Sequence, residues 1–158
     1  MKYSMERSLD RWSIYDEEHH KLGTIKQQLF GQFIFLIADK KEQYCLSRVE
    51  NEITVTYNRT AILKGKISYH DHSQIRLIRM PLIDTVEFNC EEQFWVLKQT
   101  PERNIEIYQQ DHYLGKLSHM LKIKKILEVE NSIDSLWMVF LLFYLGHYMI
   151  EDNEISLV

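Results

Sequence analysis

The chain has 158 residues, of which 45% are hydrophobic and 27% charged, and a formal net charge of -4 at pH 7. This size and composition predict one globular domain over 1–158 and exclude an intrinsically disordered chain. The acidic balance argues against a nucleic-acid partner, because nucleic-acid-binding domains normally carry a basic excess.

The N-terminal residues MKYSMERSLDRW have no apolar signal-peptide core, which predicts a cytoplasmic protein. The only two cysteines, Cys45 and Cys90, do not have the spacing of a zinc site. In the cytoplasm we expect both to be reduced thiols and small core residues, with a disulfide as the alternative.

Alternating apolar and polar residues predict β-strands through most of the first 130 residues. A strand pair is expected over 23–41, with Gly31 near the bend, followed by strands over 53–58, 61–70 and 74–80. The apolar residues assigned to these strands include Ile25, Leu29, Phe33, Phe35, Ile53, Val55 and Tyr57.

Two further strands are predicted around Glu91 and Glu92, within 85–100. A last strand is expected over 121–129, where Leu121 and Ile123 alternate before an irregularity that suggests a bulge at the following lysines. The residues assigned to shared faces of the first two strands are Val86, Phe88 and Cys90, then Phe94, Val96 and Lys98.

Short polar turns separate these runs and bring the total to about a dozen strands. Strands at this spacing, with no helical segment between them, predict an antiparallel meander that closes into a sandwich or a barrel. The turn sequences are DEEHHKLG, ADKKEQ, VENE, YNRT, HDHSQ, NCEEQ, QTPERN and QQDHYLG.

An internal similarity relates IYDEEHHKLGTI, at 14–25, to IYQQDHYLGKL, at 107–117. Both contain Ile-Tyr, a polar turn, Leu-Gly and then an aliphatic residue. This pattern predicts a hairpin used twice, in which the glycine permits an unusual backbone angle where the strand restarts. A chance match remains the alternative, because hairpins share turn chemistry.

The sixteen residues between Asp134 and Glu151 carry no charge. As a helix they span about 24 Å, short of the ~30 Å hydrocarbon core of a bilayer. Ser132 suits the N-cap, and Asp134 suits the first turn of a helix over about 133–150. A helix apolar on almost every face must be surrounded, which favours a helix inside a barrel. A membrane anchor, an apolar strand pair and a dimer helix are the alternatives.

The unit IYDEEHHKLGTIKQQ, its echo IYQQDHYLGKL and the helix SLWMVFLLFYLGHYMI resemble the tubby C-terminal-like superfamily. This group includes tubby proteins, phospholipid scramblases, LURP-one-related proteins and their bacterial relatives. The resemblance implies a mainly β fold, a closed antiparallel barrel of about twelve strands around a hydrophobic C-terminal helix.

We interpret the histidines in the polar turns as solvated residues rather than as metal ligands. His70 and His72 can face the same way, and His19 and His20 follow three acidic residues. No spacing supplies the three or four ligands that a metal needs, so we expect no metal and no cofactor. In the apolar segment, His147 is expected to be a hydrogen-bonded core residue rather than a catalytic one.

Five lysines are the candidate binding residues. On strands, residues two apart share a face, so these side chains can form an outward phosphate or anionic-lipid site. A solvated barrel exterior is the alternative. The candidate residues are Lys64, Lys66, Lys122, Lys124 and Lys125.

The sequence contains no phosphate-cradling glycine loop, nucleophile elbow or metalloprotease helix. We therefore expect a non-enzymatic binding module, cytoplasmic and peripheral to a membrane, that recognises anionic phospholipid headgroups without transmembrane insertion. The alternative is a module that binds a protein partner and has no lipid ligand.

Overall fold

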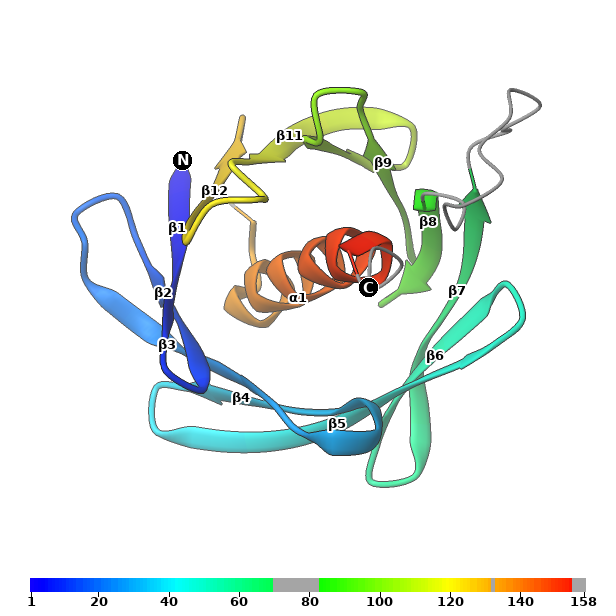
Figure 1. Ribbon diagram of the computed structural model, residues 1–158, viewed down its shortest axis with the longest axis horizontal. Helices are drawn as coiled ribbons and strands as arrows, with labels where there is room; N and C mark the ends of the chain where they lie inside the picture. The colour runs from blue at the N-terminus through cyan, green and yellow to red at the C-terminus, as the bar shows by residue number, and fades with distance from the viewer. Residues whose placement is uncertain (70–82, 132, 155–158) are drawn as a thin grey trace.

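The structure is a computed structural model that describes residues 1–69, 83–131 and 133–154. Within these residues, each of twelve strands pairs antiparallel with its sequence neighbours, and β1 pairs with β12 to close a barrel around one helix (Figure 1). This confirms the predicted fold class. The elements are β1 (Lys2–Ser8), β2 (Arg11–Tyr15), β3 (Lys21–Gln27), the 3-10 turn η1 (Leu29–Gly31), β4 (Gln32–Ile37), β5 (Lys40–Val49), β6 (Glu52–Tyr57), β7 (Thr60–Tyr69), β8 (Ile83–Cys90), β9 (Gln93–Gln99), β10 (Ile105–Gln109), β11 (His112–Ser118), β12 (Lys124–Val129) and α1 (Leu136–Glu154).

The helix α1 fills the barrel because almost all of its side chains over 136–150 are apolar. Every residue over 139–145 is buried, and the ring of Tyr144 stacks on Phe33 of β4 with centroids 3.9 Å apart. Phe140 packs edge-on against Phe35, at 5.6 Å between centroids. Over 1–69, 83–131 and 133–154, the structure contains no helix that has both the length and the hydropathy of a transmembrane span.

The start of α1 differs from the sequence-based prediction. The helix begins at Leu136, and the backbone carbonyl of Ser135 accepts bonds from the N–H groups of Met138 (3.1 Å) and Val139 (3.4 Å). Asp134 therefore precedes the helix instead of lying in its first turn. Ser132, the predicted cap, lies outside the described residues.

The shared faces predicted for β8 and β9 are both confirmed, but only the predicted face of β8 points to the interior. Val86, Phe88 and Cys90 are buried, as a shared inner face requires. In β9, Trp95 and Leu97 are buried instead, so the predicted set lies on the outer face. That outer set is Phe94, Val96 and Lys98.

Three apolar residues assigned to strands lie in turns at the barrel rim. Leu29 is 78% exposed in η1, because β3 ends at Gln27 and the chain turns there. Leu121 and Ile123 are exposed in the loop before β12, which begins one residue later than Ile123. The predicted strand over 74–80 and the turn HDHSQ are outside the described residues.

The internal similarity corresponds to two hairpins with the same register. Ile14 pairs with Gly23 and Ile107 with Gly115, and each pairing is followed by a shift at the next tyrosine. A Cβ at Gly23 would lie 2.0 Å from the carbonyl oxygen of Leu36, and one at Gly115 would lie 2.0 Å from that of Glu128. Both glycines therefore permit close approach of the next strand. The unusual backbone angle expected of them is present at Gly23, with φ of 159°, but not at Gly115.

Four of the tight turns place two consecutive non-glycine residues at positive φ. Asn58 and Arg59, for example, have φ of 50° and 65°, as do comparable pairs between β4 and β5, β8 and β9, and β10 and β11. This geometry twists in the same sense as the strands, which suits two-residue hairpins. For residues with a Cβ it costs roughly 1–2 kcal/mol each.

We expect Arg59→Gly to stabilise the protein by about 0.5–1 kcal/mol, because it relieves that strain and creates the favoured Asn-Gly turn. The unfolding midpoint should rise by roughly 2–4 °C in calorimetry. Asn51→Gly is the matched control, since Asn51 is not among the positive-φ residues. A midpoint that falls with Arg59→Gly would contradict the strain argument.

Candidate functional site

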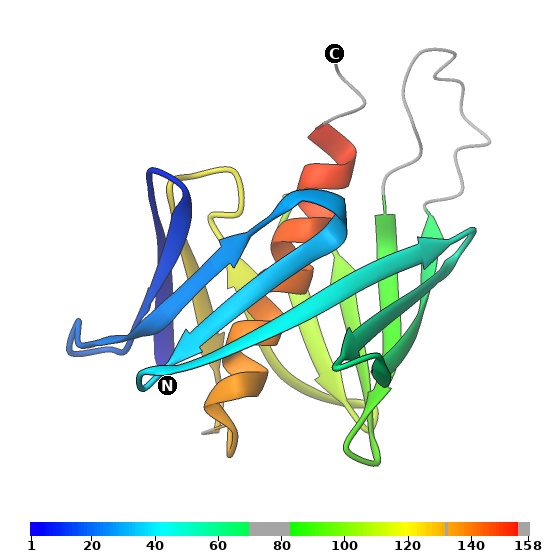
Figure 2. The same ribbon diagram turned by 90° about the horizontal axis from the view of Figure 1, so that it is seen from below.

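The barrel has two ends, because α1 runs along it from one end to the other (Figure 2). We call the end where α1 begins the basal end and the end where α1 finishes the apical end. The basal turns over 16–21, 38–42, 58–59, 91–92, 110–111 and 130–134 hold ten acidic and four basic side chains, a net charge of -6. Four neighbouring apical turns, over 6–11, 26–31, 48–51 and 119–124, hold six basic and three acidic side chains, a net charge of +3. The end of α1 adds three acidic residues to the apical end, Glu151, Asp152 and Glu154.

Exposed apolar side chains gather at the apical end. Of the eight large hydrophobic residues exposed among the described residues, six lie on these four apical turns, and only Met1 and Tyr113 are basal. Because such side chains are normally scattered singly, this grouping makes the apical end the candidate interaction surface. The six, which we call the apical rim, are Leu9, Leu29, Phe30, Val49, Leu121 and Ile123.

Basic residues flank the apical rim, and only some of them are neutralised. Asp10 forms ion pairs with Lys26 and Arg11, both at 3.3 Å, and Lys26 first and Arg11 second hold the pKa of Asp10 below its ordinary value. Lys124 lies 3.4 Å from Glu6. Arg7 is exposed, with its guanidinium over the ring of Trp12. Positive charge therefore remains at the rim.

A cavity of about 380 Å³ opens between the β1–β2 turn and η1, at the foot of the apical rim. Its wall combines two guanidinium groups with the buried Trp12 and with His147 of α1, whose ring lies 4.9 Å from that of Trp12. Leu9 and Leu29 lie at its edge. Asp10 also lines the cavity and pairs with one of the guanidinium groups, so the other guanidinium is the cation that suits an anionic headgroup beside apolar side chains. The two guanidinium groups are those of Arg7 and Arg11.

The structure does not bring the five predicted lysines together. Lys64 and Lys66 lie on the outer wall of β7, whereas the other three lie in or next to β12, and β8 to β11 stand between. Lys66 is opposite Glu52 on one side and Glu87 on the other, which balances its charge. Lys122 and Lys124 are exposed and belong to the apical end.

Lys125 was predicted to point outward with the other lysines, but its side chain points into the barrel. It is 4% exposed, and its ammonium donates to the backbone carbonyls of Met120 and Lys122. The same ammonium lies 4.9 Å from the centroid of the Trp12 ring. Side chains alternate between the two faces of β12, so Lys125 points to the same face as the buried Leu127 and Val129.

The outer wall between β9 and β1 carries alternating charges at matched register. Glu106 is opposite Lys98 and Lys116, and Glu128 is opposite Lys116 and Lys2. Such a row stabilises cross-strand pairing and leaves little net charge. The wall is therefore a solvated exterior, and the uneven charge lies at the two ends.

The histidine positions do not form a metal site among the described residues. His20 lies 3.3 Å from Asp16 and 3.5 Å from Glu18, in an exposed turn. His70 and His72 are outside the described residues. Cys45 and Cys90 are both free thiols. Cys90 is buried, as expected of a core residue, whereas Cys45 is only half-buried.

The apical rim escaped the sequence analysis, because its residues come from four separate turns. Only closure of the barrel places the loop before β12 beside the β1–β2 turn, η1 and the β5–β6 turn. The available signal was an apolar residue inside an otherwise polar turn. Leu9 in RSLDR and Val49 in RVENE are examples.

A structural comparison supports the fold. The chain is similar to the X-ray structure of a protein from Arabidopsis thaliana, AT5G01750, with a TM-score of 0.53 over 91% of this chain and 88% of that one. The sequence identity is 14%, so the similarity shows a related fold. No protein-family model and no curated protein matches the sequence.

Proposed function

We propose that the protein is a non-enzymatic binding module of the tubby-like and LURP-one-related kind, which docks through its apical end on a membrane surface containing anionic phospholipid. The apical rim carries this proposal: six exposed apolar side chains on four neighbouring turns, which together have a net charge of +3. The similar Arabidopsis structure supports the fold.

The physical chemistry of docking requires both features of the rim. Apolar side chains that enter the headgroup region leave water, and each fully buried leucine or phenylalanine contributes about 1.5–3 kcal/mol. Each lysine or arginine close to an anionic surface adds about 1 kcal/mol. Phe30 and Leu9, at 93% and 94% exposed, are the side chains best placed to enter first.

The choice of a lipid surface over a protein partner rests on charge and shape. The cations at the rim surround the apolar side chains, and the cavity beside Arg7 and Arg11 can hold a phosphoryl group at the same end. The acidic basal end would then face away from the membrane. Docking in this orientation is peripheral and leaves α1 inside the barrel.

We expect the protein to sediment with vesicles of phosphatidylcholine mixed with phosphatidylserine, and less at high salt, because screening weakens the charge term. The double variant Leu9→Ser/Phe30→Ser should lower the bound fraction at least about tenfold, since both apolar contacts are lost. Tyr113→Ser is the matched control, an exposed aromatic at the basal end, and should bind like the parent.

Charge-reversal variants test the contribution of the basic side chains separately from that of the apolar side chains. Lys122→Glu should weaken binding to anionic vesicles, whereas Lys41→Glu, an exposed basal lysine, should not. Vesicles that leave the parent in the supernatant, or that bind the apical and basal variants equally, would refute lipid docking. A salt-independent protein partner that needs Leu9 and Phe30 would assign the rim to protein recognition instead.

A further inference from the structure

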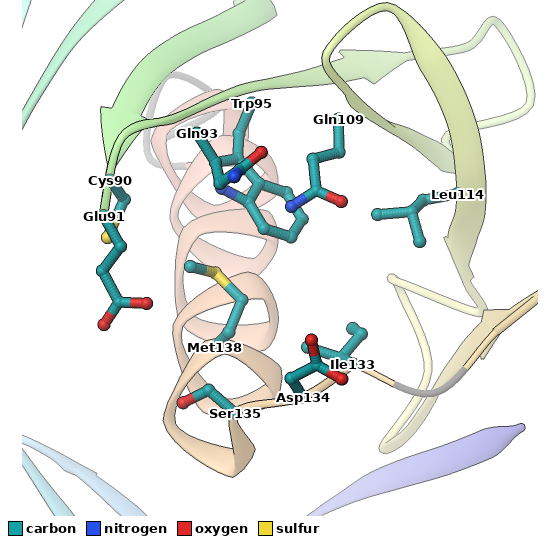
Figure 3. Close-up of a pocket in the computed structure, with 10 residues that line it drawn as sticks. All are labelled: Cys90, Glu91, Gln93, Trp95, Gln109, Leu114, Ile133, Asp134, Ser135 and Met138. Atoms are coloured by element: carbon teal, nitrogen blue, oxygen red, sulfur yellow. The ribbon is translucent and has the colours of Figure 1, made fainter.

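The basal end contains a second cavity, of about 420 Å³, between the β8–β9 turn, β10, β11 and the residues that lead into α1 (Figure 3). It lies at the opposite end of the barrel from the apical rim, so it is independent of the proposed docking. Met138 of α1 forms part of its floor, and the side-chain amides of Gln93 and Gln109 lie beside the Trp95 indole.

Trp95 supplies the observation that points to a ligand. The residue is 4% exposed, and its indole nitrogen is buried with no hydrogen-bond partner among the described residues. Its ring is held parallel to that of Phe88, at 6.2 Å between centroids and 6° between planes. A buried donor normally has an acceptor, so a donor left without one at the wall of a cavity indicates a position for an acceptor atom.

The charges around the cavity favour a cation. Glu91 and Asp134 line it, and no lysine or arginine among the described residues does so. Figure 3 shows the two carboxylates on either side of Ser135 and Met138, across the cavity from the glutamine amides. The surrounding basal turns are strongly acidic. These carboxylates therefore disfavour an anion in the cavity, although the start of a helix by itself favours one.

Burial, and after it the charge of Glu91, raises the pKa of the Cys90 thiol to about 11. At neutral pH this cysteine stays protonated, so it contributes a neutral, apolar wall to the cavity rather than a nucleophile. Leu114 and Ile133 add aliphatic surface. The cavity thus combines carboxylates, amides, one buried donor and apolar walls.

We propose that this cavity binds a small organic amine, whose ammonium group pairs with Asp134 and Glu91 and whose carbonyl oxygen accepts a hydrogen bond from Trp95. The glutamine amides complete the polar contacts of the carbonyl end. The aliphatic part of the ligand packs on Met138 and Leu114. A volume of this size suits a small molecule.

The test uses δ-aminovaleramide, which has an ammonium group and an amide carbonyl on one chain, and caproamide, in which a methyl group replaces the ammonium. The readout is the indole N–H signal of Trp95 in a nitrogen–proton correlation spectrum, assigned with Trp95→Phe. We expect δ-aminovaleramide to shift this signal saturably and caproamide to bind at least about tenfold more weakly, because the charge-assisted contacts are missing.

Substitutions test whether Asp134 and Glu91 are the carboxylates that bind the ammonium group. Asp134→Asn with Glu91→Gln should weaken δ-aminovaleramide binding at least about tenfold, whereas Glu92→Gln, at the other position of the same turn, should not. All of these side chains are exposed, and the backbone spectrum reports whether each variant is folded. An unshifted Trp95 signal at saturating δ-aminovaleramide, equal binding of caproamide, or equal binding by the double variant would each overturn the proposal.

Discussion

Replacing Phe140 with Ala is expected to lower the free energy of unfolding by roughly 3–5 kcal/mol. Phe140 is fully buried, its ring meets Phe35 edge-on, and its tip lies 2.9 Å from the position that a Cβ of Gly23 would occupy. Removing the ring therefore leaves a cavity between α1 and the strands β3 and β4. A domain is held together by roughly 5–15 kcal/mol, so this is a large fraction of the total.

The measurement is denaturant unfolding of Phe140→Ala beside Phe30→Ala, the same chemical change at a side chain that is 93% exposed. The second variant should unfold like the parent. A chain ending before Ser132 extends the test, because the inner faces of the strands would lose their packing partner. We expect it to show no cooperative transition. Equal midpoints for parent and truncated chain would mean that α1 is not part of the core.

Much of the fold was predictable because the strand alternation, the polar turns and the uncharged segment all indicate the same architecture. The polar turns fall where the strands end, for example at Asn58 and Arg59, and the uncharged stretch before Glu151 is a buried helix. In β9 both faces carry large apolar residues, so the shared face predicted for Phe94, Val96 and Lys98 did not show which face is internal. Whether Phe94 or Trp95 points to the interior depends on the register of β9 with β8. The two-residue period of the sequence does not determine that register.

The candidate sites were less predictable, because they depend on contacts between distant segments. The apical rim requires barrel closure, and the basal cavity joins Trp95, Gln109 and Asp134, which come from β9, β10 and the residues before α1. The lysine pairs looked equivalent in the sequence. In the structure, Lys124 is exposed beside Glu6, whereas its neighbour Lys125 is inside the barrel.

Lys125→Glu is expected to destabilise the protein by at least about 3 kcal/mol or to prevent folding. The buried ammonium donates to the carbonyls of Met120 and Lys122 and lies over the ring of Trp12. A carboxylate at this position would face two acceptors and the negative face of the indole. The loop before β12, which carries part of the apical rim, would lose the interaction that holds it against the barrel.

Lys124→Glu is the matched control, because it changes the same charge one residue earlier. Its ion pair with Glu6 is solvent-exposed, and such pairs are worth about 0–1 kcal/mol, so its midpoint should stay close to that of the parent. Lys125→Met keeps the aliphatic stem but leaves the two carbonyls without this donor, which should cost about 1–3 kcal/mol. Urea unfolding of the three variants ranks them, and equal midpoints would place Lys125 outside the barrel. If Lys125→Met, once folded, still sediments with anionic vesicles, the charge of Lys125 serves the fold, and docking relies on the exposed cations of the rim.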